Sequence, residues 1–302
     1  MPSPGDAVVG LLRQADSLAA SASAVASDWR SLLGGSEPLD WLDRRDPEHI
    51  RRTLPAMKAY GEIYHRAEVR GLDNIPAEGP VLLVGNHSGG TLIADTFVFS
   101  AAFYEHFGPA REFHQLAHDM VFRVPGARAL VAPWGTVPAN PENMKRALDR
   151  DAALLVYPGG DWETYRPSWE SSKIDFAGRK GFARLALEYG VPIVPVVSIG
   201  GQETALFLGQ GNRLARALRL DKTFRIKVLP PVLGPPVGPT VLDLPIRFPL
   251  PAKITVSVGQ PIDLREKLGS RAGADDAYEL VTSNMQRTLT RLGNERTVPV
   301  VG

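Results

Sequence analysis

The chain of 302 residues contains no cysteine. This absence excludes disulfide bonds, thiolate metal sites, a cysteine nucleophile and an acyl-cysteine intermediate. The chain also lacks a run of about 18 apolar residues, the length that a helix needs to span a bilayer. Its start, MPSPGDAVVG, lacks the basic and apolar regions of a signal peptide, so none is expected. A lipid substrate would therefore have to be reached from the membrane surface.

Neither sign of charge dominates the composition. The 34 lysines and arginines nearly balance the 33 aspartates and glutamates, which gives a formal net charge of +1. Proteins that bind nucleic acid usually have a clear basic excess, so no nucleic-acid partner is expected. Hydrophobic residues make up 44% of the chain and charged residues 22%, as in an ordinary globular protein. We expect an N-terminal helical segment over residues 1–58 and a catalytic domain over residues 59–302.

Short apolar runs alternate with loops and helical patterns from residue 80 onward. Residues 81–84 form a continuously apolar run between Pro80 and Gly85, which is typical of a strand buried on both faces. Further strands are predicted at 129–132, 152–157 and 193–197, and helices at 96–107, 144–151 and 181–190. This succession predicts an α/β fold, a mostly parallel sheet flanked by helices with an added N-terminal helical segment.

Two longer segments flank this pattern. Residues 8–34 place apolar side chains at roughly helical spacing, which predicts amphipathic helices that pack on the main domain or lie on a membrane. The proline-rich residues 227–253 form a long connection, interpreted as a lid or as a membrane-facing edge.

Ligands of parallel α/β sheets gather at the carboxyl ends of the strands, and two loops are predicted there. One contains His87 and the other follows the strand at 152–157. Histidine is the side chain best suited to accept a proton from an alcohol near neutral pH. Asp95 lies eight residues later, near a predicted helix start, from which a carboxylate could orient the imidazole. On spacing alone, a histidine that caps the loop explains the pattern equally well.

Two other chemistries were weighed. A serine hydrolase would use Ser88, but the chain has no G-x-S-x-G sequence to expose that hydroxyl on a strained turn. A metal hydrolase would need a ligand cluster, and the chain has no H-E-x-x-H sequence. His114 and His118 are four residues apart, a spacing that packing or surface residues explain better than metal ligation.

The central block Gly178–Pro195, GRKGFARLALEYGVPIVP, resembles the long signature of the diacylglycerol and monoacylglycerol acyltransferase family. That family belongs to the glycerol-phosphate and lysophospholipid acyltransferase superfamily. The tail of the signature has its counterpart in Ser198–Glu203, and Val69–Pro76 and Val258–Ile262 resemble flanking elements. The resemblance spans roughly residues 60–265, and its central block is long enough to be specific.

The resemblance implies an acyltransferase mechanism. His87 would be the general base that deprotonates the acceptor hydroxyl, and Asp95 would be its orienting partner. The hydroxyl would attack the thioester of acyl-CoA, or of an acyl-carrier protein, without an acyl-enzyme. Backbone N–H groups of the glycine-rich loops would stabilise the oxyanion, at about 3 kcal/mol per donor. The resemblance implies no metal and no permanently bound cofactor.

The chain departs from the superfamily pattern at two places. The superfamily usually has Asp five positions after the histidine, where this chain has Leu92, and the acid comes only at Asp95. The phosphate-binding Glu-Gly-Thr-Arg segment is replaced by residues 158–163, PGGDWE. Loss of that arginine favours a neutral acceptor, although Arg166 keeps a phosphate-bearing acceptor open.

The residues expected to contact substrate come from both loops and from a third segment. Arg179 and Lys180 precede a predicted helix N-terminus, which suits the phosphates of coenzyme A or a solvated surface pair. Asp161 and Glu163 either line the acceptor site or satisfy loop backbone groups. The full predicted binding set is Ser88, Gly89, Gly90, Gly159, Gly160, Asp161, Glu163, Arg166, Arg179 and Lys180.

The sequence thus predicts an O-acyltransferase that moves a fatty acyl group from acyl-CoA to a neutral glycerolipid or a long-chain alcohol. We expect it on the cytoplasmic side, in peripheral contact with a membrane and without a transmembrane helix. Three alternatives remain. One is a lysophospholipid or glycerol-phosphate acyltransferase, and two come from other classes: a Ser88-dependent lipid hydrolase and a silent lipid-binding protein.

Overall fold

The computed structural model describes residues 40–298, except residues 91–92, 125, 213–216, 218–228, 236–237, 241–242, 244–247 and 270. The helices predicted within residues 8–34 lie outside the described residues. The boundary predicted at residue 58 stays a prediction.

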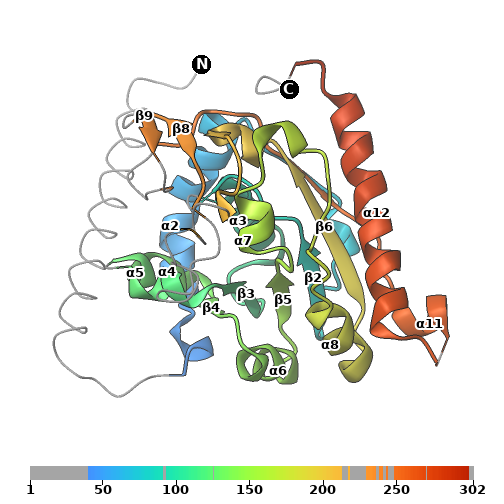
Figure 1. The fold of residues 1–302 in the computed structure, drawn as a ribbon. Helices are drawn as coiled ribbons and strands as arrows, with labels where there is room; N and C mark the ends of the chain where they lie inside the picture. The colour runs from blue at the N-terminus through green and yellow to red at the C-terminus, as the bar shows by residue number, and fades with distance from the viewer. Residues whose placement is uncertain are drawn as a thin grey trace.

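A seven-stranded sheet forms the centre of the molecule, as Figure 1 shows. Its strands, in spatial order, are β1 (Glu68–Arg70), β10 (Thr255–Val258), β6 (Ile193–Ile199), β2 (Val81–Gly85), β5 (Ala153–Val156), β3 (Phe113–Ala117) and β4 (Thr136–Pro138). Only the β10–β6 pair is antiparallel. The predicted mostly parallel sheet is therefore confirmed.

Helices cover both faces of this sheet (Figure 1). On one face lie α2 (Pro47–Ala59) and α3 (Ala94–Phe107), and on the other lie α6 (Pro141–Asp149), α8 (Gly181–Tyr189) and α12 (Ala274–Glu295). Because both faces are covered, every residue of β2, β5 and β6 is buried.

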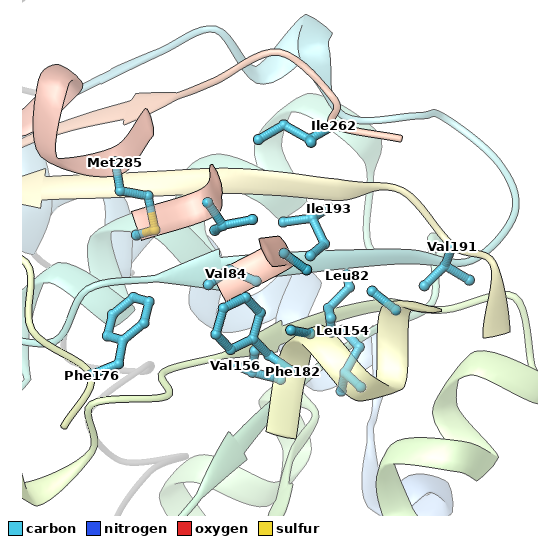
Figure 2. Close-up of a cluster of buried hydrophobic side chains, with 14 of the residues drawn as sticks. Leu82, Val84, Leu154, Val156, Phe176, Phe182, Val191, Ile193, Ile262 and Met285 are labelled. Carbon is cyan, nitrogen blue, oxygen red and sulfur yellow. The ribbon is translucent and has the colours of Figure 1, made fainter. Parts of the chain in front are cut away.

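Alternate residues of the central strands enter two separate hydrophobic cores. Leu82 and Leu154 point toward α8 and α12, in the cluster that Figure 2 shows with Met285. Their neighbours Leu83 and Leu155 point toward α2 and α3. Successive side chains of a strand point to opposite faces of the sheet. Because each face of these strands meets a hydrophobic core, the strands appear in the sequence as continuously apolar runs, as predicted.

Shorter elements connect the layers. They are η1 (Leu42–Arg44), the π-helix η2 (Tyr60–Tyr64), η3 (Leu72–Asn74), α4 (Asp119–Arg123), α5 (Ala127–Val131), η4 (Ala132–Trp134), α7 (Asp161–Thr164), η5 (Ser168–Glu170), η6 (Gly201–Thr204) and α11 (Leu264–Leu268). A second, antiparallel sheet contains β7 (Leu206–Phe207), β8 (Val232–Gly234) and β9 (Gly238–Thr240). No helix in the described part of the chain is long and apolar enough to cross a membrane.

The strand predicted at residues 129–132 is wrong. Most of that run belongs to α5, and the side chain of Leu130 is 49% exposed. An alanine-rich run with one exposed face suits a helix better than a buried strand. The strands of this region are instead β3 and β4, neither of which was predicted. The other predicted strands and helices are present within a few residues, and Gly190 ends α8 in the left-handed conformation.

We expect the core substitution Leu154→Ala to lower the free energy of unfolding by about 2–5 kcal/mol, because a fully buried side chain leaves a cavity that the sheet cannot close. Urea denaturation followed by circular dichroism measures the change. The matched variant Leu130→Ala, on the exposed face of α5, should change it by no more than about 0.5 kcal/mol. Equal losses in the two variants would contradict this assignment of core and surface.

Candidate active site

Three loops meet at the carboxyl ends of β2, β5 and β6. The Asn86 side chain joins the first and third: its Nδ2 donates to the Ser198 carbonyl at 2.9 Å and its Oδ1 accepts from the Ser198 N–H at 2.8 Å. The second loop is joined through Glu163 of α7, which accepts from the His87 N–H at 3.2 Å. The structure therefore brings the two predicted loops together and adds a third, residues 200–204.

His87 follows β2 directly and is only partly buried. Its ring stacks on Tyr157 with a centroid distance of 4.3 Å and an interplanar angle of 23°. Its Nδ1 is enclosed and has no hydrogen-bond partner, which leaves Nε2 as the nitrogen that a ligand can reach. Burial lowers the pKa of His87 to about 3, so the imidazole is neutral at physiological pH.

Gly85 makes the stacking arrangement possible. A Cβ atom at this position would lie 2.5 Å from the Tyr157 ring. The Tyr157 hydroxyl accepts a hydrogen bond from Thr96 at 2.9 Å. Burial raises the pKa of this phenol well above its ordinary value, and the nearby Asp95 carboxylate adds to the effect. Tyr157 is therefore a neutral, anchored platform under the imidazole.

Asp95 lies in the first turn of α3, but its carboxylate does not reach His87. Oδ2 accepts from the Ser88 hydroxyl at 3.1 Å and the Ser198 hydroxyl at 3.0 Å, and Oδ1 accepts from the Thr96 N–H at 2.8 Å. Burial raises its pKa to about 6, and these hydrogen bonds partly oppose the rise. No hydrogen bond joins His87 and Asp95 in the described residues, so the predicted orienting role of Asp95 has no geometric support here and stays a prediction.

Ser88 is buried beneath the third loop. Its hydroxyl donates directly to Asp95, without a histidine between them. Gly201 covers Ser88 so closely that a Cβ at 201 would overlap the hydroxyl oxygen. A serine nucleophile needs its hydroxyl exposed and bonded to the base, and neither condition holds for Ser88.

Glu163 and Arg166 form a buried ion pair behind the His87 loop, 3.0 Å apart. Glu163 also accepts from the Asp175 N–H at 3.1 Å, and Arg166 donates to the Lys173 carbonyl. Burial raises the pKa of Glu163 to about 7, while Arg166 and the backbone donors lower it. Gly159 provides the space for this carboxylate, because a Cβ there would overlap it. Glu163 therefore satisfies loop backbone groups, one of its two predicted roles.

Three of the glycine N–H groups predicted to bind an oxyanion already have partners. Gly89 N–H donates to Gln202 at 3.3 Å, Gly90 N–H to the Thr164 carbonyl at 3.2 Å, and Gly160 N–H to the Tyr157 carbonyl at 3.1 Å. Gly89 and Gly90 both have positive φ, which lets the loop pack closely against Gly201 and Phe207. For these three glycines an oxyanion role would require the hydrogen bonds to be exchanged, and the predicted role stays a prediction.

The basic pair predicted to hold phosphate is bonded to carboxylates. Arg179 pairs with Asp161 at 2.7 Å and donates to the Gly159 carbonyl at 2.8 Å. Lys180 pairs with Asp275 of α12 at 2.8 Å. Both cations keep solvent exposure, and Arg179 links α8 directly to the second loop of the site. Exposed ion pairs are weak, so a ligand phosphate could displace them.

Sequence reasoning missed several residues that build the site. Tyr157 ends the predicted strand at 152–157, and Ser198 and Gln202 fall in the signature tail. Position at the carboxyl end of a buried strand was the available signal for all three. His114, whose spacing from His118 was explained by packing or surface residues, lies buried in β3 and contacts Glu112 at 2.9 Å. Among the described residues no group of three or more His, Asp or Glu side chains is arranged to hold a metal ion.

This arrangement defines the class of the fold: an α/β protein with a histidine loop at the carboxyl end of a central parallel strand. The Acyltransferase family matches residues 66–199, which contain β2, β5, β6 and the first two loops and end just before the third. Together with the relatives below, this match shows that the chain belongs to the acyltransferase family.

Curated relatives extend the similarity beyond that range. An uncharacterized protein of Mycobacterium tuberculosis is 31% identical over 283 residues, which cover 91% of this chain and 75% of the relative. The DGAT1/2-independent enzyme synthesizing storage lipids from Bos taurus is 31% identical over 252 residues, which cover 82% of this chain and 71% of the relative. The protein is an acyltransferase of the glycerolipid acyltransferase superfamily.

A solved structure supports the fold. The 1-acyl-sn-glycerophosphate (LPA) acyltransferase PlsC from Thermotoga maritima superposes with a TM-score of 0.51. The match covers 82% of each chain at 15% sequence identity. At this identity the likeness concerns the fold alone.

We expect Asp95→Asn to stabilise the protein in a pH-dependent way. The folded-state pKa of Asp95 is raised, so the contribution of this one carboxyl to stability is greatest below about pH 4 and is lost as the pH rises through about 6. Asparagine cannot ionise, so above pH 6 the variant should gain on the order of 2 kcal/mol relative to wild type. Denaturant titrations at several pH values measure the difference. Glu163 titrates in both proteins, so its contribution cancels from the difference in unfolding free energy between them. If that difference did not change with pH, the raised pKa of Asp95 would be contradicted.

Gly159→Ala should displace Glu163 from the His87 backbone, because the new Cβ overlaps the carboxylate. We expect the free energy of unfolding to fall by about 1–3 kcal/mol. We also expect kcat to fall by a larger factor than KM changes. Gly181→Ala is the matched control, since its Cβ meets no atom and it opens α8. Full activity in Gly159→Ala would show that the contact between Glu163 and the His87 backbone is not needed for the function of the loop.

Proposed function

We propose that the protein is an O-acyltransferase that moves a fatty acyl group from acyl-CoA to a hydroxyl of a neutral glycerolipid or a long-chain alcohol. His87 is the general base. The observation that carries this proposal is the state of His87: a neutral imidazole, stacked on Tyr157, with Nδ1 enclosed and Nε2 left for the substrate.

The reaction proceeds in one transfer. Nε2 of His87 takes the proton of the acceptor hydroxyl as its oxygen attacks the thioester carbonyl carbon. The tetrahedral intermediate collapses with cleavage of the C–S bond, and the imidazolium returns its proton to the thiolate. The products are the ester and free coenzyme A. Tyr157 limits rotation of the imidazole, and Glu163 holds the His87 backbone N–H. The imidazole therefore loses little rotational entropy when the acceptor binds.

The electrostatics behind the loop favour an uncharged acceptor. The Arg166 guanidinium is buried and bonded to Glu163 and to carbonyls of residues 170 and 173, so it offers no open site for a phosphate. Asp161 adds a carboxylate at the start of α7, in the segment that replaces the Glu-Gly-Thr-Arg sequence of the superfamily and lacks its arginine. The bovine relative is named for storage-lipid synthesis, which also suits a neutral acceptor.

Acyl-CoA is the donor that suits the exposed basic pair. Its phosphates would compete with Asp161 for Arg179 and with Asp275 for Lys180, ahead of the N-terminus of α8.

Glycerol-phosphate and lysophospholipid acceptors are the second candidate within the same chemistry. A hydrolase that uses Ser88 is disfavoured by the burial of that hydroxyl and by its direct bond to Asp95.

His87→Ala should lower the rate of CoA release by about 10²–10⁴-fold, the usual contribution of a general base. The assay offers palmitoyl-CoA with a panel of mono- and diacylglycerols, long-chain alcohols, lysophospholipids and glycerol phosphate, and it measures free thiol. His106→Ala, at a partly exposed histidine of α3, is the matched control and should keep wild-type activity. We expect turnover only with the neutral acceptors.

Ser88→Ala separates the transferase from the hydrolase. In the transferase the substitution removes one hydrogen bond to Asp95 and should cost less than about tenfold in rate. Loss of turnover in Ser88→Ala equal to that in His87→Ala, with fatty acid as product, would establish the hydrolase instead. Equal thiol release by the wild type and His87→Ala would refute His87 as the base.

A further inference from the structure

One side chain of the third loop bonds to the backbone of both other loops of the site. The Gln202 carbonyl oxygen accepts from the Gly89 N–H at 3.3 Å, and its amide group donates to the Arg166 carbonyl. Gln202 is buried, so water does not compete for these bonds. Gly89 lies two residues after His87, and the third loop therefore contributes to how the His87 loop is held.

The residue that follows Gln202 is tied to the long helix α12. The two terminal nitrogens of the Arg296 guanidinium donate to Glu203, Nη1 to Oε1 and Nη2 to Oε2, each at 2.6 Å. The Glu203 side chain is 15% exposed and that of Arg296 is 11% exposed. A bidentate, charge-assisted pair has a defined geometry, and a pair largely shielded from solvent is weakened little by salt. The Glu203–Arg296 pair therefore fixes the distance between the third loop and α12.

Both partners of this pair are anchored in one packed core. Arg296 directly follows α12. Leu289 and Leu292 of that helix are buried in the same hydrophobic cluster as Ile199, the last residue of β6. Figure 1 shows α12 running alongside β6. The third loop begins one residue beyond Ile199, so a short path leads from the core to each partner. The pair is therefore a rigid link between two fixed elements.

The two ends of the third loop are held independently of Arg296. Gly200 packs against the Lys253 carbonyl so closely that a Cβ at 200 would overlap it. At the other end, the Leu250 N–H donates to the Thr204 carbonyl at 2.7 Å. Loss of the Arg296 side chain should therefore loosen the middle of the loop and leave its ends in place. We expect such a variant to remain folded.

A neighbouring ion pair at the same end of α12 has a different setting. Glu295 pairs with Arg70 of β1 at 2.5 Å, and both side chains are more than two fifths exposed. β1 is an edge strand, separated from β2 by β10 and β6. Exposed pairs contribute little, because solvent screens them and the long side chains lose entropy when they are held. Glu295 is therefore a matched control for Arg296, at the same helix end but linked to the edge of the sheet.

We propose that Arg296 is a positioning residue for acyl transfer. Through Glu203 it holds the third loop, and through Gln202 that loop holds the backbone of the His87 loop. The proposal rests on the proposed function in taking His87 as the general base, because the rate of the transfer depends on how narrowly that base is oriented. A pair that only stabilised the fold would leave kcat and the motions of the His87 loop unchanged.

Arg296→Gln should lower the kcat of CoA release about tenfold and change the KM for acyl-CoA by less than about twofold, because a looser loop holds the base in the productive orientation less often. Arg296→Lys keeps the charge but loses the bidentate geometry, so its kcat should be intermediate. Glu295→Gln is the matched control and should keep the wild-type kcat. The assays are run at a temperature at which circular dichroism shows every variant to be folded.

A double-mutant cycle tests the route through Gln202. Gln202→Ala alone removes the hydrogen bonds to Gly89 and Arg166 and should also lower kcat. If Arg296 acts through this side chain, adding Arg296→Gln to Gln202→Ala should lower kcat by less than about a further twofold. Losses that multiply as if the two residues were independent would contradict the route and overturn the proposal.

Hydrogen–deuterium exchange measures the two loops without any turnover. Arg296→Gln should raise the exchange rates of peptides that cover residues 86–90 and 200–204 about tenfold, because the hydrogen bonds of the His87 loop open more often. Glu295→Gln should leave these rates unchanged. Wild-type exchange or wild-type kcat in Arg296→Gln would overturn the proposal, as would equal losses of kcat in Arg296→Gln and Glu295→Gln.

The exchange measurement separates this proposal from the proposed function. If the wild type releases no CoA with any acceptor, the proposed function fails. The exchange rates of Arg296→Gln and Glu295→Gln then still decide whether Arg296 holds the His87 loop.

Discussion

Strand β2 forms backbone hydrogen bonds with β5 on one side and β6 on the other, and the whole site depends on this pairing. The three strands are parallel, so their carboxyl ends emerge at one edge and release three loops within contact distance of one another. Asn86 extends the β2–β6 ladder by one further pair of hydrogen bonds beyond the last strand residue. The histidine that follows is therefore fixed by the sheet itself rather than by a flexible connection.

The polar groups behind His87 form two separate networks. Asp95 ties Ser88 to β6 on one side, and Glu163 ties the His87 backbone to α7 and Arg166 on the other. Both carboxylates are held where burial raises their pKa, which costs stability, and each is retained by several donors. Buried, destabilised polar groups of this kind are typical of functional sites. The stacked Tyr157 ring and the hydrogen bond from the His87 N–H to Glu163 hold the imidazole in place. The Asp95 carboxylate instead accepts from Ser88 and Ser198.

The fold class could be predicted because the central strands are buried on both faces and so appear as uninterrupted apolar runs. Strands β3 and β4 could not, because the polar side chains of His114 and Gln115 hydrogen-bond across the pair to the Gly135 carbonyl and to Thr136, and no local pattern reveals such partners. At the site, His87 and the loop positions follow from strand order. The partner of Asp95 could not be predicted in this way, because spacing along the chain does not specify whether its carboxylate faces Ser88, Ser198 or His87.

The contact between Gly85 and Tyr157 has a consequence for sequence variation in the family. The ring of Tyr157 occupies the space that any other side chain at 85 would fill, and the same ring supports His87. A relative with a larger residue at the end of β2 must therefore carry a smaller residue, or a ring turned elsewhere, at the end of β5. We therefore expect the two positions to change together, and a change at either one to alter how the histidine ring is supported.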